Sequence, residues 1–407
     1  MFDGDPTPRL FAVPPGVDFP AALIDGLRRR LAGAPPDAMA RVELLVNTRR
    51  MARRLRELSE AGPPGLLPRI RLVTDLGEDP GFAGIPPAVP DLRRRLELTQ
   101  LVSRLLRKEP DLAPPSLLYD LADSLAGLMD EMQGEGVTPD DIAALDVSAS
   151  SGHWQRAQKF VALVGRYFDT DVHAPTSELR QRLVVERLIE QWQDSPPPHP
   201  VIVAGSTGSR GTTARLIHAV AQLPQGAVVL PGFDFDLPRK VWDAMGQALQ
   251  SEDHPQFRFG RMARDLTLHP STGVRRWVDT PPVIPARNAL VSLSLRPAPV
   301  TDQWLSEGPR LADIARAAAD ITLIEAPSRR IEAQAIALRM RQAAETGQTI
   351  ALITPDRMLA RQVTAALDRW GIIPDDSPEY VHEFVVKQER VTNRKDKGFA
   401  LLIEEIE

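Results

Sequence analysis

Residues 201–220, VIVAGSTGSRGTTARLIHAV, contain the pattern that most restricts the fold of this chain. Residues 201–203 form a β-branched apolar run that is typical of a buried strand, and residues 214–220 continue with helical spacing. The segment between them is rich in glycine and hydroxyl side chains, which is typical of a loop. The stretch therefore predicts a strand, a loop and a helix, the unit from which parallel α/β folds are built.

The loop at residues 205–211 could present backbone N–H groups to a phosphate at the start of the helix. A P-loop needs G-x-x-x-x-G-K-[ST], because its lysine neutralises the phosphates and its hydroxyl residue binds Mg²⁺. Here Thr212 follows Gly211, and no lysine comes after it. The same residues are also compatible with an ordinary strand-to-helix turn, so both interpretations stay open.

Length and composition limit the class of protein. The 407 residues are enough for two or three domains. There is no cysteine, which excludes disulfides, thiolate-bound zinc and cysteine-bound iron–sulfur clusters within these residues. The net charge of -5 gives no overall basic field, so nucleic acid would need a local basic patch. Without a membrane-length apolar run or a signal-peptide pattern, we expect a cytoplasmic protein with no membrane contact.

Short apolar strands alternate with amphipathic helices near the start of the chain. Asn47 and Thr48 are suited to cap a strongly basic helix, RRMARRLRELSEAG. This alternation predicts the α/β class, with a parallel sheet covered by helices on both faces. The predicted strands are residues 9–13, 41–46 and 68–73, and the first predicted helix is residues 20–31.

The remaining pattern divides the chain into further segments. Residues 89–195 show long helical periodicity and are predicted to form an insertion, and a Pro-rich linker then leads to the strand at 201. Residues 258–319 are predicted to form a Pro-rich irregular crossing. The expected domains are a first α/β domain at 1–88 and 196–257, the insertion at 89–195, the crossing at 258–319, the start of a second α/β domain at 320–377 and a divergent tail at 378–407. Within the second domain, strands are predicted at 321–326, 349–353 and 371–373, and helices at 330–344 and 356–370.

Taken together, several of these segments resemble a known family. RVELLVNTRRMARRLRE, LLPRIRLVTDL, VIVAGSTGSRGTTARLI, VLPGFDFDLP and TIALITPDRMLARQVTAALDRWGIIPDDS are similar to the N-terminal part of AddB, the second subunit of the bacterial AddAB helicase–nuclease, in its alphaproteobacterial form. The resemblance covers Arg9 to Ser377. It implies double-strand-break repair in a heterodimer with an AddA-like helicase/nuclease subunit that binds ATP and Mg²⁺. It also implies a superfamily 1 helicase-like (RecA-like) fold whose motor motifs have decayed.

The resemblance does not reach the C-terminal nuclease domain that AddB proteins carry. After Ser377 the segment PEYVHEFVVKQER does not align with the family, and the nuclease signature would lie beyond residue 407. Neither nuclease activity nor the family's iron–sulfur cluster is therefore assigned to these residues. A fragment or a frameshifted gene would explain the divergent tail.

The loops that would bind ATP in a working helicase lack the necessary residues. Gly16-Val17-Asp18-Phe19 stands where the resemblance places a P-loop, and an aspartate there repels a triphosphate. We therefore expect no cofactor in this chain, assign no catalytic residue to it, and expect it to be catalytically inactive by itself.

Three patches are candidates for contacts with a DNA backbone, because hydroxyl groups, arginines and helix N-termini commonly bind phosphates. Their residues are Thr48, Arg49, Arg50, Arg53 and Arg54 in the first patch, Ser206, Thr207, Ser209, Arg210 and Thr212 in the second, and Thr354 and Arg357 in the third. Each has a structural alternative. For the first patch it is a solvated helix face paired with Glu57 and Glu60, and for the second it is an ordinary turn. For the third patch it is a helix start at Thr354-Pro355-Asp356.

Two other functions are compatible with the sequence. A pure protein-interaction subunit would dock the motor through the helical insertion and touch no DNA. An independent nucleotide-binding α/β enzyme would bind nucleotide by itself. Asp234 and Asp236 could form a metal pair, but an FDFD segment after a strand is also typical of a turn with solvated acids, and no metal is expected.

Overall fold

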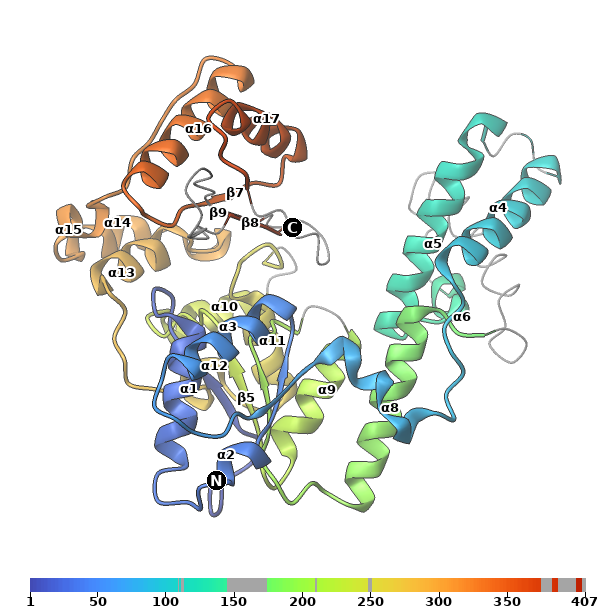
Figure 1. Cartoon of the computed structure of the whole chain (residues 1–407), viewed down its shortest axis with the longest axis horizontal. Coiled ribbons are helices and arrows are strands. Elements are labelled where there is room, and N and C mark those ends of the chain that lie inside the picture. The colour runs from blue at the N-terminus through green and yellow to red at the C-terminus, as the bar shows by residue number, and fades with distance from the viewer. Residues whose placement is uncertain are drawn as a thin grey trace. The chain divides into compact units, whose positions relative to one another are not determined.

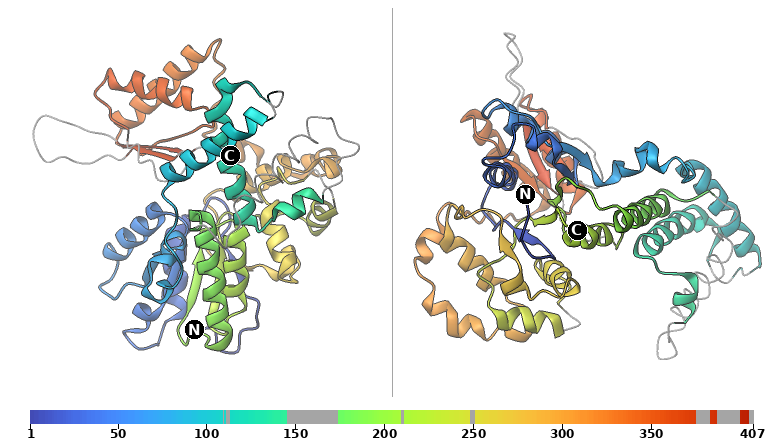
Figure 2. Two further views of the ribbon diagram at one scale, coloured as in Figure 1. Left: turned by 90° about the vertical axis from the view of Figure 1, so that its right-hand side faces the viewer. Right: turned by 90° about the horizontal axis from the view of Figure 1, so that it is seen from below.

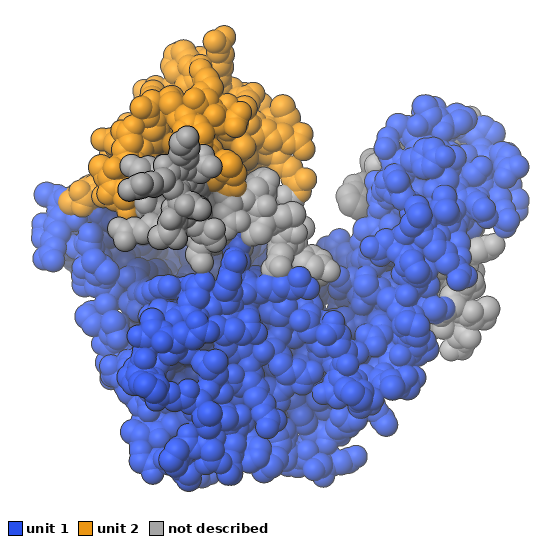
Figure 3. Space-filling model, in the orientation of Figure 1, with its two compact units in different colours: residues 1–317 blue, residues 318–407 orange. Residues whose placement is uncertain are grey.

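The computed structural model describes residues 1–108, 110, 113–144, 174–208, 211–247 and 251–374, together with the backbone of strands at 383–386 and 400–404 (Figure 1). The chain forms two compact units, Met1–Ala317 and Ala318–Glu407 (Figure 3). Each unit has a hydrophobic core of its own.

Unit 1 is built on a six-stranded parallel sheet with the strand order β3-β2-β4-β5-β1-β6. Its central strands are rich in valine and leucine and are buried on both faces, as expected for a parallel sheet covered by helices. The predicted α/β class with a covered parallel sheet is therefore confirmed. The strands are β1 (Leu10–Ala12), β2 (Glu43–Val46), β3 (Arg69–Leu72), β4 (Val201–Ala204), β5 (Gly226–Leu230) and β6 (Arg275–Arg276).

Helices cover the two faces of the sheet (Figure 2). Successive residues of a strand point to opposite faces, so Leu44 and Ile202 belong to one core, and Leu45 and Val203 belong to the other. Within the described ranges, no helix combines the length and the apolar composition that crossing a membrane requires. One face is covered by α1 (Phe19–Arg30) and α3 (Arg49–Glu60), and the other by α8 (Ser177–Asp194), α9 (Gly211–Gln222), α10 (Arg239–Gln247) and α11 (Phe257–Asp265).

A helical insertion separates β3 from β4. Its helices α4 (Asp91–Lys108) and α5 (Leu118–Glu135) pack against each other around a separate apolar core that includes Leu98 and Leu125. The short helix α6 (Pro139–Ala143) follows, and α8 leads back to the sheet with Val184 buried in the sheet core. We call residues 91–135 the helical arm. None of the described arm residues belongs to either core of the sheet.

The irregular crossing predicted for residues 258–319 is wrong, because this segment is largely helical. Phe259 and Met262 lie in the sheet core, and Nε1–H of Trp277 donates to the carbonyl of Leu23 at 3.2 Å. The prediction took the prolines of this segment as signs of a loop. The prolines of α12 and α13 instead stand in the first turn of a helix, where the backbone N–H that proline lacks would have no partner within the helix. The segment contributes α12 (Pro270–Gly273), β6, α13 (Pro285–Ser294), α14 (Gln303–Glu307) and α15 (Ile314–Ala318), besides most of α11.

Unit 2 contains α16 (Arg329–Glu345), β7 (Ala351–Ile353) and α17 (Arg357–Asp368), and the two helices enclose a small core. Strand β7 pairs in parallel with β9 (Ala400–Glu404), which pairs antiparallel with β8 (Glu383–Val386). The predicted helices and the predicted strand at 349–353 are confirmed.

Residues 321–326 and 371–373 form no strand, contrary to the prediction. Leu323 is 84% exposed, and Ile321 and Ile324 are exposed as well. The apolar run at 321–326 has the composition of a strand. It pairs with no strand in the part of the chain that the structure describes, and a strand needs such a partner to bind its backbone groups.

Two glycines inside helices test the packing of unit 1. A Cβ atom on Gly26 of α1 would lie 2.1 Å from Nε1 of Trp277, whereas one on Gly127 of α5 would meet no atom within 4 Å. We expect Gly26→Ala to lower the free energy of unfolding by about 2 kcal/mol through overpacking. Gly127→Ala should raise it by about 1 kcal/mol, because alanine favours a helix. Denaturant unfolding followed by circular dichroism measures both, and equal effects would contradict the packing described.

Candidate nucleic-acid interface

The loops after β1, β2 and β4 meet at the carboxyl edge of the sheet. Strands β2 and β4 are neighbours, with Val46 opposite Ala204. A Cβ atom on Gly205 would lie 3.4 Å from Cε1 of Phe19 in α1 and 3.9 Å from Cε of Met51 in α3. Because α3 and α9 leave this edge toward opposite faces, it is a topological switch point, where α/β folds commonly bind ligands. The first and second predicted patches therefore lie close together.

The first patch begins with the cap of α3. Oγ1 of Thr48 accepts a hydrogen bond from the backbone N–H of Met51 at 3.1 Å, which confirms the predicted cap. Arg49 and Arg53 are exposed one turn apart, and Arg50 is half-buried. These side chains project from the helix that begins directly at the edge of the sheet.

Arg54, the last residue of the first patch, is engaged within the protein. It forms ion pairs with Asp18 at 3.6 Å and with Glu57 at 3.9 Å. For Arg54, the alternative of an internally paired helix face is therefore correct.

The charges at the start of α3 oppose helix stability. A helix N-terminus carries a partial positive charge, which acidic side chains stabilise and basic side chains destabilise. Helix α3 starts with Arg49 and Arg50, and its first turn contains no acidic residue. Such a local conflict is typical of positions retained for function rather than for stability. The arrangement favours an anionic partner at this helix start.

The loop after β4 contains two glycines with positive φ angles and a serine that bonds to the loop backbone. Gly205 and Gly208 adopt positive φ angles of 78° and 64°, a region that glycine enters easily. Ser206 is buried, and its Oγ accepts a hydrogen bond from the backbone N–H of Gly208 at 3.2 Å. Thr207 is exposed. Two further predicted contacts, Ser209 and Arg210, lie outside the described residues.

A carboxylate of the helical arm binds the N-terminus of α9. The backbone N–H of Gly211 donates to Oε1 of Glu135 at 2.7 Å, and Oγ1 of the buried Thr212 donates to the carbonyl of Gly134 at 3.1 Å. The N–H group expected to meet a phosphate is therefore used by the protein itself. A DNA contact through Thr207 or Thr212 stays a prediction.

A carboxylate also stands at the loop after β1. Oδ1 of Asp18 accepts a hydrogen bond from the backbone N–H of Ala21 at 3.1 Å and so caps α1. From α13, Nδ2 of Asn288 donates to the carbonyl of Pro15 at 2.8 Å. A phosphate at this helix start would have to displace the Asp18 carboxylate from its hydrogen bond.

The third patch lies in unit 2 and forms a helix cap. Thr354 is buried, and its Oγ1 accepts a hydrogen bond from the backbone N–H of Asp356 at 3.1 Å. Oδ1 of Asp356 accepts from the N–H groups of Met358 at 2.8 Å and Leu359 at 3.2 Å, directly after which α17 continues. The helix-start alternative is correct, with Asp356 as the cap. A DNA contact through Thr354 or Arg357 stays a prediction.

Asp234 and Asp236 form a turn after β5. Oδ1 of Asp234 accepts a hydrogen bond from the backbone N–H of Asp236 at 2.9 Å, and the backbone N–H of Asp234 donates to Oε1 of Gln256 at 2.9 Å. Burial raises the pKa of Asp234, and a hydrogen bond with Ser292 opposes that rise. Among the described residues, no group of three or more His, Cys, Asp or Glu side chains could hold a metal ion.

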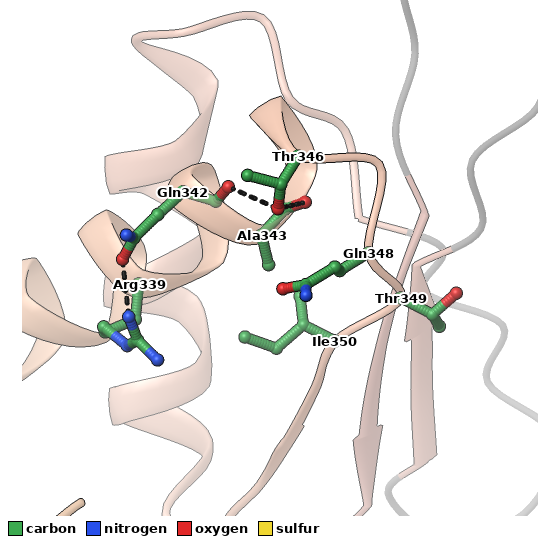
Figure 4. Close-up of a pocket in the computed structure, with 7 residues that line it drawn as sticks. All are labelled: Arg339, Gln342, Ala343, Thr346, Gln348, Thr349 and Ile350. Carbon is green, nitrogen blue, oxygen red and sulfur yellow. Dashed lines mark hydrogen bonds between the residues drawn. The ribbon is translucent and has the colours of Figure 1, made fainter. Parts of the chain in front are cut away.

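Unit 2 contains a surface cavity of about 300 Å³ at the end of α16 (Figure 4). Arg339 donates a hydrogen bond to the side chain of Gln342, and Oγ1 of Thr346 donates to the carbonyls of Gln342 and Ala343. Three of the lining side chains, those of Arg339, Gln342 and Thr346, therefore form hydrogen bonds within the cavity wall. None of the predicted DNA contacts lines it.

Sequence reasoning missed two residues that act at the carboxyl edge, Glu135 and Asn288. Glu135 lies 76 positions before Gly211, and Asn288 lies 273 positions after Pro15. No local pattern encodes such distant pairs. One signal was present, since the first turn of α9 has no acidic residue of its own and a carboxylate from elsewhere could fill that place.

No protein-family model matches the chain, and no curated protein matches it.

Asp18→Ala tests the role of the carboxylate after β1. We expect the free energy of unfolding to fall by about 1 kcal/mol, because α1 loses its cap. ATP binding should not appear, since the loop still has no lysine. Asp302→Ala is the matched control, because Asp302 precedes α14 without making a capping hydrogen bond. Denaturant unfolding and titration with a fluorescent ATP analogue measure the two effects, and saturable ATP binding by either protein would contradict the expectation.

Proposed function

We propose that this chain is a non-motor, AddB-like subunit that binds DNA strands in a helicase–nuclease complex processing double-strand breaks. In this proposal, unit 1 is an inactivated superfamily 1 helicase-like (RecA-like) domain with a helical insertion, and unit 2 begins a second such domain. An AddA-like subunit is the partner in the cytoplasm and supplies the motor, with its ATP and Mg²⁺.

The basic start of α3 is the observation that carries the proposal. Arg49 and Arg53 are exposed at the carboxyl edge of the sheet, and Thr48 is the helix cap beside them. The phosphates of a DNA strand would supply the negative charge that the first turn of α3 lacks. Contacts of this kind position a strand without reading its sequence, as a subunit that follows a moving strand requires.

The carboxylates at the two other helix starts support a subunit without a motor. Asp18 caps α1 where a phosphate-binding loop would stand, and Glu135 binds the start of α9. A triphosphate would meet like charge at both places, and repulsion between like charges disfavours its binding. The independent nucleotide-binding enzyme is for this reason the weakest of the three functions.

Binding of a labelled single-stranded oligonucleotide, followed by fluorescence anisotropy at several salt concentrations, tests the proposal. We expect Arg49→Gln/Arg53→Gln to weaken binding and to lower the slope of log affinity against log salt by about one for each arginine that contacts a phosphate. Stability should not fall, because the replaced charges lie near the positive end of the helix.

The matched control is Arg187→Gln/Arg261→Gln, which removes the same charge from exposed positions on α8 and α11. It should leave affinity and slope unchanged. Equal affinities of the two double variants would contradict the proposal. The measurement uses the chain alone and in complex with its motor partner.

A protein-interaction subunit is the second candidate, and exposed apolar side chains on the helical arm favour it. Leu92 is 68% exposed and Leu96 is 54% exposed, one turn apart on α4, and Tyr119 of α5 is exposed too. If the arm docks the motor and the chain touches no DNA, binding of the oligonucleotide will be weak and nearly independent of salt.

A further inference from the structure

The helical arm is attached to the rest of unit 1 at one end. Its last three residues bond to segments outside the arm, and the side chain of Gln133 accepts a hydrogen bond from Oγ1 of Thr176. The carbonyl of Gln133 also accepts from Nη1 of Arg182 in α8 at 3.3 Å. Gly134 and Glu135 bond to the first residues of α9. Since 18 residues of helix extend about 27 Å, α5 is a lever held at its C-terminal end (Figure 1).

The chain enters and leaves the insertion at neighbouring points. The backbone N–H of Val89, just before α4, donates to the carbonyl of Pro175, just before α8, at 2.9 Å. Nε of Arg180 also donates to the carbonyl of Pro86 at 3.1 Å. The arm has its own apolar core, so a rotation about this neck would leave both cores of the sheet intact.

Close approach of the arm to α9 depends on Gly211. A Cβ atom at this position would lie 2.7 Å from Oε2 of Glu135, 2.9 Å from its Cα and 3.0 Å from the carbonyl oxygen of Gly134. Two of these atoms are backbone, which cannot give way without moving α5. Glycine at position 211 is therefore needed for the hydrogen bond between its N–H and Glu135.

The contact at Glu135 is polar. A carboxylate binds a backbone N–H at a helix start, where the partial positive charge of the helix strengthens the hydrogen bond. Nearby, Glu186 of α8 forms ion pairs with Arg182 at 2.9 Å and with Arg215 of α9. Interactions between exposed charges weaken as salt increases, whereas apolar packing does not. The polar contacts between the C-terminal end of α5 and α9 should therefore weaken as salt increases.

From these contacts we infer that Glu135 is a latch that holds the helical arm in one of two positions. In the closed position its carboxylate binds the N–H of Gly211. Loss of that bond leaves only the contacts of Gln133 and Gly134 at this end of the arm. These break more easily without it, so that the arm turns about the neck at Val89 and Pro175 and its end at Lys108 moves away from the closed position. This motion does not require that the chain binds DNA.

Double electron–electron resonance tests the latch directly. The sequence has no cysteine, so Lys108→Cys at the end of α4 and Arg261→Cys in α11 place two spin labels without background. The closed arm should give one narrow distance distribution. Glu135→Ala and Gly211→Ala should each broaden it and shift its mean, the first by removing the carboxylate and the second by steric exclusion. High salt should broaden the distance distribution of the unmutated protein and shift its mean in the same direction.

Two matched controls lie on the same helix. Glu131→Gln neutralises an exposed carboxylate about one turn earlier, and Gly127→Ala adds a Cβ in open space. Both should leave the distribution unchanged. Circular dichroism verifies that every variant is folded, and if Gly211→Ala unfolds, Glu135→Ala decides the question. A Glu135→Ala distribution identical to that of the parent would overturn the latch, as would a parent distribution already as broad as that of the variant.

Discussion

The pairing of β2 with β4 is the contact on which the arrangement of unit 1 depends. It joins residues 43–46 to residues 201–204 across the whole helical insertion. A shift of one residue in this register would turn every side chain of β4 to the opposite face, so the two cores select it strongly. The same pairing brings the loops before α3 and α9 together, and the candidate interface exists because those loops are neighbours.

Three helix starts gather at this edge, and they are satisfied in different ways. Helix α1 receives the carboxylate of its own cap, Asp18, whereas α9 receives Glu135 from the helical arm. Helix α3 is capped by the hydroxyl of Thr48, and its first turn contains arginines and no acidic residue of its own. Carboxylates thus bind backbone N–H groups at the first two starts, whereas a hydroxyl does so at the third. This difference between otherwise similar helix starts is the basis of the proposal that the start of α3 binds an anionic strand.

Much of the fold could be predicted from local pattern, because strand and helix periodicities are properties of neighbouring residues. The strands at 41–46 and 201–203 and the cap at Thr48 were predicted correctly for this reason. The segment at 258–319 was not, since a proline that begins a helix has the same composition signal as one in a loop. At 321–326 the composition predicted a strand that the structure does not contain. A strand requires a neighbouring strand, and the residues of the run itself do not specify one.

The candidate site was predictable only in part. Arg49 and Arg53 follow a cap that is legible in the sequence, so their place at a helix start could be expected. The hydrogen bond of the Gly211 N–H could not be predicted, since its acceptor, Glu135, lies 76 positions earlier in the sequence. Long-range pairs of this kind decide whether a glycine-rich loop is open to a ligand or closed by the protein.

The hydrogen bond between Val89 and Pro175 affects which sequence changes the insertion can accept during evolution. Because the two ends of the insertion meet at one point, the residues between them can lengthen, shorten or be exchanged for another module without altering the register of the sheet. The register of the sheet thus constrains the insertion little, and the contact of Glu135 with Gly211 is a place where the two must change together.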